Sequence, residues 1–166
     1  MHIRSGKSQL TTISTTRKIQ IAIALSSVIF TVGTTLQNFV IINTSLIEKM
    51  MWMENVADPA GAAPSFTMWF RVVGCLYILG NSVGILALRS QSRLLWWTVF
   101  MVNITQAFGF VLIPSSMWSA VIATYGVWGI LPSLITDGGA IFLVLVMIHS
   151  MVKYRGPWAQ HRLSQQ

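Results

Sequence analysis

The sequence predicts an all-α integral membrane protein, a four-helix bundle with both termini on the cytoplasmic side. Hydrophobic residues make up 54% of the 166 positions and charged residues only 9%, so the chain has more apolar surface than a soluble core of this size can bury. The apolar residues fall in four segments, each with the roughly 20 residues that cross a hydrocarbon layer of about 30 Å. Basic residues collect at alternate ends of these segments, as expected for cytoplasmic loops.

The Lys and Arg residues orient the bundle. Nine of the eleven lie where alternate ends of the segments meet one side of the membrane: Arg4, Lys7, Arg17, Lys18, Arg89, Arg93, Lys153, Arg155 and Arg162. The acidic residues lie toward the other side: Glu48, Glu54, Asp58 and Asp137. Because Lys and Arg are retained on the cytoplasmic side during insertion, we expect both ends of the chain inside and the acids outside.

The first predicted span covers residues 19–47 and follows a basic stretch that ends at Lys18. It is longer than the core of a signal peptide and no small-x-small cleavage pattern follows it, so we expect it to be retained. The outer loop that follows contains an Ala-, Gly- and Pro-rich stretch, residues 58–64, which is not expected to fold alone. The second predicted span covers residues 66–88.

The third predicted span covers residues 94–113 and ends before Pro114. A short connection, residues 89–93, joins it to the second span and predicts an antiparallel hairpin of helices. The fourth span covers residues 132–153, with Pro132 at its start, where a missing backbone donor costs little.

The outer connection between the last two spans has helical character of its own. Apolar side chains recur at helical spacing there, which predicts a short helix over residues 116–126 lying in the membrane interface. A tight loop that dips its aromatic side chains into the headgroups is the alternative.

Two ionisable residues inside the spans form the first candidate site. Arg71 and Asp137 each lie a few residues from the outer end of their predicted helix, which places both about 7 to 8 Å below it. An isolated charge in hydrocarbon costs several kcal/mol, so we expect the two to pair. In the alternative, Arg71 extends to the headgroups and Asp137 is a solvated residue of the first helical turn.

Four amides are predicted to surround this level. Gln37 and Asn38 belong to a polar stripe on the first span, and Asn103 and Gln106 lie three apart on one face of the third. Buried amides need hydrogen-bond partners, so we expect these side chains to turn inward and form an outward-facing polar pocket with the ionisable pair. The alternative is interhelical hydrogen bonding without a cavity.

The expected partners are the lipid bilayer and other membrane helices. Gly80 and Gly84 form a Gly-x-x-x-Gly step, which allows close approach of a neighbouring helix, a membrane protein partner or a second copy of the chain. The net charge of +7 is spread over membrane flanks, which indicates topology and attraction to anionic lipid, and no nucleic-acid partner is expected. The expected location is a cell membrane, by default the bacterial cytoplasmic membrane.

Function is only weakly determined by the sequence. The favoured hypothesis is a ligand-binding or accessory subunit in which Arg71 holds an anionic group, Asp137 is the counter-ion and the amides orient the ligand. A transporter or channel is the alternative. It would be an oligomer, because four unbroken spans without a repeat lack the usual plan of a single-chain transporter. An intramembrane enzyme with Asp137 as general base is the second alternative. No metal or cofactor spacing is present, and the plan is similar in topology alone to small bacterial four-helix proteins such as the DoxX-like group.

Overall fold

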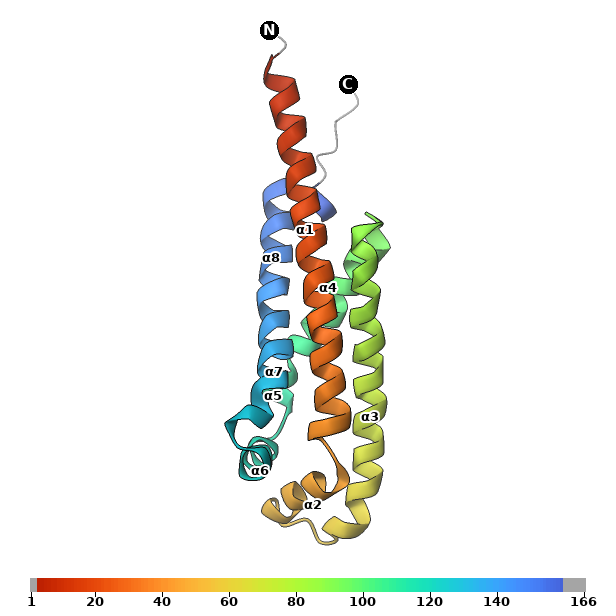
Figure 1. Ribbon diagram of the computed structural model, residues 1–166, viewed down its shortest axis with the longest axis vertical. Coiled ribbons are helices and arrows are strands. Elements are labelled where there is room, and N and C mark those ends of the chain that lie inside the picture. Colours follow the sequence, from red (N-terminus) through yellow and green to blue (C-terminus); the bar gives the residue numbers. More distant parts are fainter. Residues whose placement is uncertain (1–2, 160–166) are drawn as a thin grey trace.

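The computed structural model describes residues 3–159, with side chains from residue 14 onward. Every regular element in this part of the chain is helical. Within it, four segments are long and apolar enough to cross a membrane: Ser14–Ile41, Pro59–Leu88, Arg93–Leu112 and Val127–Tyr154. The predicted all-helical fold is therefore confirmed, with four helices of the described chain long and apolar enough to cross a membrane (Figure 1).

The first span is interrupted near its end. Helix α1 (Ile3–Leu36) continues into the π-helical segment η1 (Gln37–Ile41), and Ile42 then adopts extended backbone angles. Asn43 starts a new helix, α2 (Thr44–Met53), because its side-chain oxygen accepts a hydrogen bond from the Leu46 backbone nitrogen at 3.0 Å. The continuous helix expected over residues 19–47 is thus divided by a helix cap.

The second span begins earlier than expected. Helix α3 (Pro59–Val83) starts within the stretch that was not expected to fold, because Asp58 caps the Gly61 nitrogen at 3.0 Å and Pro59 suits the first helical turn. It ends in the 3₁₀ segment η2 (Gly84–Leu88). The third span divides at Phe108 into α4 (Arg93–Ala107) and α5 (Gly109–Leu112).

The fourth span is built from several short pieces followed by one long helix. The helix predicted over residues 116–126 is present as α6 (Ser115–Tyr125). The span itself comprises η3 (Val127–Ile130), α7 (Leu131–Ser133), the π-helical segment η4 (Leu134–Gly138) and α8 (Gly139–Tyr154), and a 3₁₀ turn, η5 (Pro157–Ala159), follows it.

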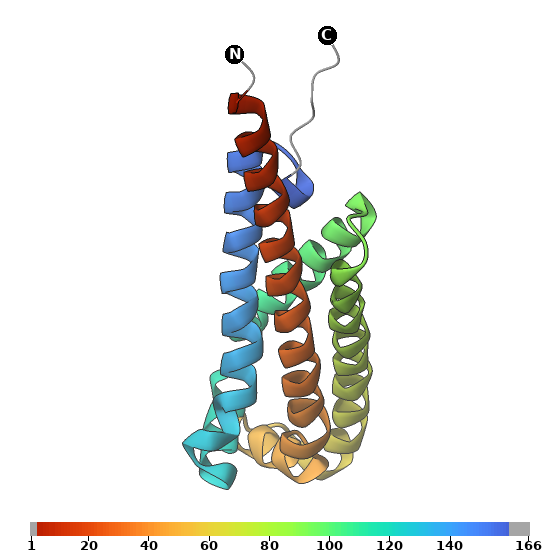
Figure 2. The same ribbon diagram turned by 45° about the horizontal axis from the view of Figure 1, so that its top comes forward.

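The helices form a bundle with α1 between α8 and α3 (Figure 1). Helix α4 starts beside the end of α3 and crosses behind α1 toward α8, as both views show (Figures 1 and 2). The start of α1 and the end of α8 lie at one end of the bundle, which we call the termini end. The short helices α2 and α6 lie at the opposite end, which we call the α2/α6 end.

Two apolar clusters fill the interior. The larger packs α1, α4 and α8 and includes Phe30, Trp96, Phe100, Leu143 and Met147. The smaller lies between α2, α6 and the start of α3, and we call it the end cluster. It consists of Ile42, Leu46, Ile47, Met50, Met51, Ala63, Met117, Ala120 and Val121.

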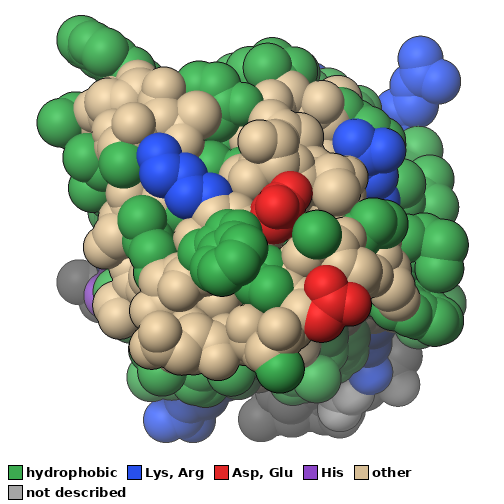
Figure 3. All heavy atoms as spheres, turned by 90° about the horizontal axis from the view of Figure 1, so that it is seen from below, with side chains coloured by type: hydrophobic (Ala, Val, Ile, Leu, Met, Phe, Trp, Pro, Cys, Tyr) green, Lys and Arg blue, Asp and Glu red, His purple; other side chains and the backbone are tan. Residues whose placement is uncertain are grey.

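Charged side chains separate between the two ends. The described basic residues Arg17, Lys18, Arg89, Arg93, Lys153 and Arg155 belong to segments at the termini end. Glu48, Glu54 and Asp58 belong to α2 and the connection to α3, and acidic side chains are visible on the α2/α6 end (Figure 3). Lys49 is a basic residue of that end, where its Nζ donates to the Thr124 hydroxyl at 3.1 Å.

The glycine step of the second span, Gly80 on α3 and Gly84 at the start of η2, contacts helices of the same chain. A Cβ added at Gly80 would lie 2.8 Å from a methyl group of Val102 on α4. A Cβ added at Gly84 would collide with the hydroxyl of Ser27 on α1. The two glycines thus allow α4 and α1 to approach α3 closely, and this packing occupies the face predicted to receive a neighbouring helix.

Candidate functional site

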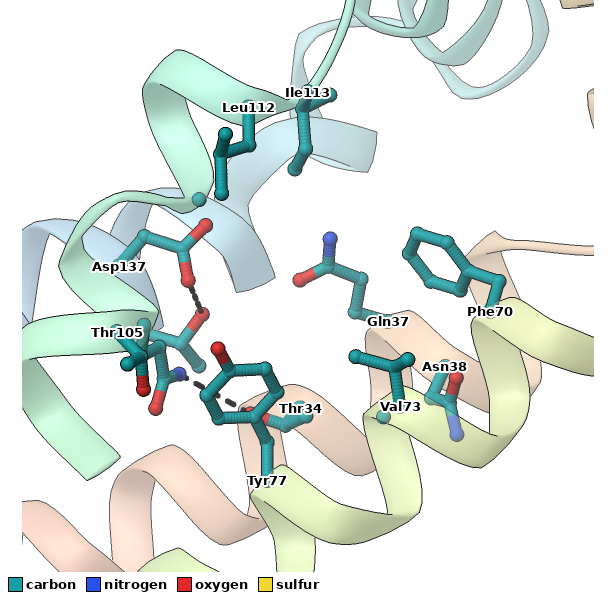
Figure 4. Close-up of a pocket in the computed structure, with 14 residues that line it drawn as sticks. Thr34, Gln37, Asn38, Phe70, Val73, Tyr77, Thr105, Leu112, Ile113 and Asp137 are labelled. Carbon is teal, nitrogen blue, oxygen red and sulfur yellow. Dashed lines mark hydrogen bonds between the residues drawn. The ribbon is translucent and has the colours of Figure 1, made fainter. Parts of the chain in front are cut away.

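A cavity of about 190 Å³ lies between α1, α3, α4–α5 and η4 (Figure 4). Its lining residues with polar side-chain groups are Thr34, Gln37, Asn38, Tyr77, Thr105, Gln106, Thr136 and Asp137. The rest of its wall consists of Phe70, Val73, Gly74, Gly109, Leu112 and Ile113. Of the six residues predicted to form the site, four therefore line one cavity: Gln37, Asn38, Gln106 and Asp137.

Three helix irregularities meet at this cavity. The π-helical segment η1 carries Gln37 and Asn38, and the π-helical segment η4 carries Asp137. The break between α4 and α5 places Gly109 on the same wall. A π-helical turn inserts an extra residue and turns the following side chains relative to a regular helix, and such turns are frequent at functional sites. The irregular backbone therefore directs polar groups of otherwise apolar spans toward one space.

Asp137 is the charged residue of the cavity wall. It is 6% exposed, and its Oδ1 accepts a hydrogen bond from the Thr136 hydroxyl at 3.2 Å. The Gln106 amide also interacts with the carboxylate. A Cβ at Gly109 would lie 3.0 Å from Oδ2, so the glycine allows α5 to approach the acid. Among the described residues that line the cavity, none is basic.

Gln106 ties three helices together on this wall. Its Oε1 accepts a hydrogen bond from Asn81 Nδ2 of α3 at 2.9 Å, and its Nε2 lies 3.4 Å from the Thr34 hydroxyl of α1. Both bonds are buried, which makes them costly to break. Asn81 is absent from the predicted site, although an amide within an apolar helix is the signal that identified the other four.

Asn38 lies at the contact between α1 and α3. Its Nδ2 donates to the Arg71 backbone oxygen at 3.2 Å, and its side chain covers Gly74. Its Oδ1 is buried without a hydrogen-bond partner among the described residues. Gln37, one residue earlier, is half-buried, and its amide extends into the cavity (Figure 4). The two adjacent amides therefore differ in role, one holding helices together and the other facing the open space.

Asn103 is buried but lies away from the cavity. Its Nδ2 donates to the Val99 backbone oxygen of its own helix at 2.8 Å. Its Oδ1 has no hydrogen-bond partner in the described chain. The structure therefore does not bring Asn103 to the other predicted ligand-binding residues.

The predicted ion pair between Arg71 and Asp137 is absent from the described part of the chain. The Arg71 side chain is exposed and does not line the cavity, and burial and hydrogen bonds rather than a cation surround Asp137. Phe70, Val73 and Tyr77 form the cavity-facing stripe of α3, and Arg71 lies about 100° around the helix from Phe70. The alternative of a solvated Asp137 fails as well, because the carboxylate is buried. Extension of Arg71 toward the headgroups remains a prediction.

The cavity opens on the flank of the bundle. The end cluster lies at the α2/α6 end, where the sequence predicts the opening, and Phe70 and Ile113 pack against it from the cavity wall. That end presents a closed surface (Figure 3). The exposed lining residues Val73, Thr105 and Leu112 belong to α3 and α4–α5. The mouth of the cavity is therefore the gap between these helices.

No family model matches the chain, and no curated protein or solved structure is similar to it. The chemistry of the cavity is then the basis for assigning a function. It combines one buried carboxylate, a free amide and apolar walls. Such a set accepts hydrogen bonds and favours positive charge, and it holds an apolar group beside them.

Proposed function

We propose that the chain is a small polytopic protein of a bacterial cytoplasmic membrane that binds a small ligand in this cavity, alone or as an accessory subunit. The observation that carries the proposal is Asp137, a carboxylate buried at a cavity wall without a basic residue among the described lining. An unpaired charge at membrane depth is costly and marks a functional site by default. A ligand that brings a cation or several hydrogen-bond donors offsets this cost.

The charge of the ligand follows from the position of Arg71. With that side chain outside the cavity, the anionic group expected from the sequence has no cation to bind. Asp137 and the free amide of Gln37 instead favour a positively charged or donor-rich group. The volume of about 190 Å³ is below the 300 to 1,000 Å³ of drug-sized sites, so it admits a compact group.

The membrane orientation belongs to the same proposal. Basic residues of the termini end support a cytoplasmic position for both termini, because such residues are retained during insertion. Helices α2 and α6 then lie in the outer interface, where the exposed Trp52 and Trp128 match an aromatic belt. Reporter fusions at the two ends test this orientation, and opposite locations of the two reporters contradict it.

Native mass spectrometry of the solubilised protein tests the binding function. Asp137→Asn keeps the size of the side chain and removes its charge, so we expect a copurified small molecule to be lost from this variant. Arg71→Gln is the matched control, since it also removes an intramembrane charge but lies outside the cavity. Equal occupancy of the parent and Asp137→Asn proteins would contradict a role for the carboxylate.

A transporter is the second candidate, and the interrupted spans favour it. The sequence predicts unbroken helices, whereas η1 and η4 interrupt two spans at the level of the cavity. Such π-helical turns within a helix are frequent at functional sites, and transporters often place their substrate sites at helix irregularities near mid-membrane. Uptake of radiolabelled methylammonium into liposomes tests this candidate, and uptake equal to that of empty liposomes excludes it for small amines. The enzyme alternative gains no support, because the described lining holds neither His nor a second carboxylate.

A further inference from the structure

Resting on the proposed binding function, we infer that the ligand is a single-chain amphiphile with an amine head, which enters from the bilayer through the mouth between α3 and α4–α5. The head binds beside Asp137 and Gln37, and the chain leaves through the mouth between Val73 and Leu112.

The shape of the bundle creates the mouth. Helices α3 and α4 meet at their hairpin near the termini end and then diverge, because α4 crosses toward α8 (Figures 1 and 2). The exposed lining residues mark the opening: Val73 is 50% exposed and Leu112 is 75% exposed. The cavity therefore opens to the surface on the side where Val73 and Leu112 are exposed.

The other walls are closed by packing. The end cluster covers the α2/α6 end. Toward α8, close contacts at two glycines seal the space: a Cβ at Gly33 would lie 2.6 Å from a methyl carbon of Thr136, and one at Gly139 would lie 2.5 Å from the Phe30 ring. The large apolar cluster continues from Phe30 toward the termini end. A ligand dissolved in water at either end of the bundle thus has no direct path to Asp137.

The depth of the mouth selects a membrane-dissolved ligand. Val73 lies 14 residues after Pro59 in a span of 30 residues, which is about 21 Å along a helix of about 45 Å. This rim is near the middle of its span, where the surroundings are acyl chains, and the opposite rim, Leu112, is the last residue of its own span. A molecule that reaches the mouth from there needs an apolar part, while the carboxylate favours a cationic head.

The composition of the wall excludes a phospholipid. A phospholipid brings a phosphate, and the described lining offers a carboxylate and no basic side chain to receive it. A long-chain amine carries the required positive charge without an anionic group, and one chain can extend along Val73 and Leu112 into the bilayer.

Binding of radiolabelled dodecylammonium to the full-length protein in phosphatidylcholine nanodiscs tests the inference, with empty nanodiscs as background. We expect saturable binding that unlabelled dodecylammonium displaces and dodecanoate does not. Butylammonium, which has the head without the long chain, should displace it at least about tenfold less well. Asp137→Asn should weaken binding by about tenfold or more.

The mouth is tested by a matched pair of variants on α3. Val73→Trp fills the mouth and should slow dodecylammonium binding by about tenfold or more, whereas Leu76→Trp should not change it. Leu76 is the control because it is also exposed, at 64%, and lies outside the cavity. Leu112→Trp repeats the test from the opposite rim if Val73→Trp fails to give a monodisperse protein.

The outcomes separate the inference from the proposed function. Equal displacement by butylammonium, or unchanged binding in Val73→Trp or in the Leu112→Trp variant that replaces it, overturns the bilayer route. Binding that still depends on Asp137 leaves the proposed function standing. A copurified phospholipid that disappears in Asp137→Asn overturns the ligand class and also leaves the function standing. If no binding depends on Asp137 and no molecule copurifies, both the inferred ligand and the proposed binding function are overturned.

Discussion

The contact between Gly74 and Asn38 allows a quantitative test of how the cavity wall is built. A Cβ at Gly74 would collide with the Asn38 amide, whose Nδ2 would lie only 2.6 Å away. The amide cannot withdraw easily, because it is 1% exposed and its Nδ2 donates to the Arg71 backbone oxygen at 3.2 Å. Gly74→Ala therefore forces Asn38 to move or α3 to shift away from η1.

The expected cost combines two terms. Overpacking at a well-packed contact costs about 1 to 3 kcal/mol, and loss of the hydrogen bond from Asn38 adds about 0.5 to 1.5 kcal/mol. The higher helix propensity of Ala relative to Gly offsets up to about 1 kcal/mol of this cost. We therefore expect Gly74→Ala to lower the free energy of unfolding by about 0.5 to 3.5 kcal/mol.

A double-mutant cycle isolates the contact. In the Asn38→Ala background the obstructing amide is gone, so Gly74→Ala should become neutral or slightly stabilising, with a coupling energy of about 2 kcal/mol. Unfolding in mixed micelles by added dodecyl sulfate, followed by tryptophan fluorescence, measures each variant. Gly138→Ala is the control, because its backbone is helical and its Cβ would meet only Phe110, at 3.8 Å.

Two results would refute this reasoning. One is a Gly74→Ala protein as stable as the parent. The other is the same loss of stability with and without the Asn38 amide, which would place the strain elsewhere in the helix contact. A loss in Gly138→Ala as large as in Gly74→Ala would show that any alanine in these helices is disruptive.

Three further predictions use the same unfolding assay. Arg71→Gln should lower the free energy of unfolding by at most about 0.5 kcal/mol, since the side chain is exposed. A loss of about 3 to 5 kcal/mol would instead indicate that Arg71 forms a buried ion pair. Asp137→Asn should stabilise the ligand-free protein by removing a buried charge, and a less stable variant would reveal a cation partner. Asn81→Ala should cost about 1 to 3 kcal/mol because Gln106 Oε1 loses its donor, and an additive effect with Gln106→Leu would contradict that bond.

The class of fold could be predicted because its signals are local and add along the chain. Apolar length identifies a span without knowledge of its neighbours, and the recurrence of apolar residues identified α6 before its packing was known. The helix ends were less predictable, because caps compete with apolar continuity. Asn43 ends the first span inside an apolar run, and Asp58 begins α3 before the apolar run starts.

The composition of the site was partly predictable for the same reason. A polar side chain in an apolar span needs a partner, and this rule identified Gln106 and Asp137. The rule cannot say which amide donates a hydrogen bond to the backbone of its own helix, as Asn103 does to the Val99 oxygen. The π-helical turns are also invisible to a regular period, since one inserted residue changes the face on which later side chains lie.

Depth and direction are independent properties of a helical residue, and the chemistry of the cavity depends on direction. Arg71 lies about 18 Å from the start of its span and Asp137 about 15 Å from the start of its own, so their positions along the two spans differ by only about 3 Å. The rotation of α3 separates them, and the contacts at Gly74 and Gly84 fix that rotation by admitting Asn38 and Ser27. A turn of about 100° would replace Phe70 by a guanidinium in the wall. The small residues that fix the rotation of α3 thus decide which side chains face the cavity.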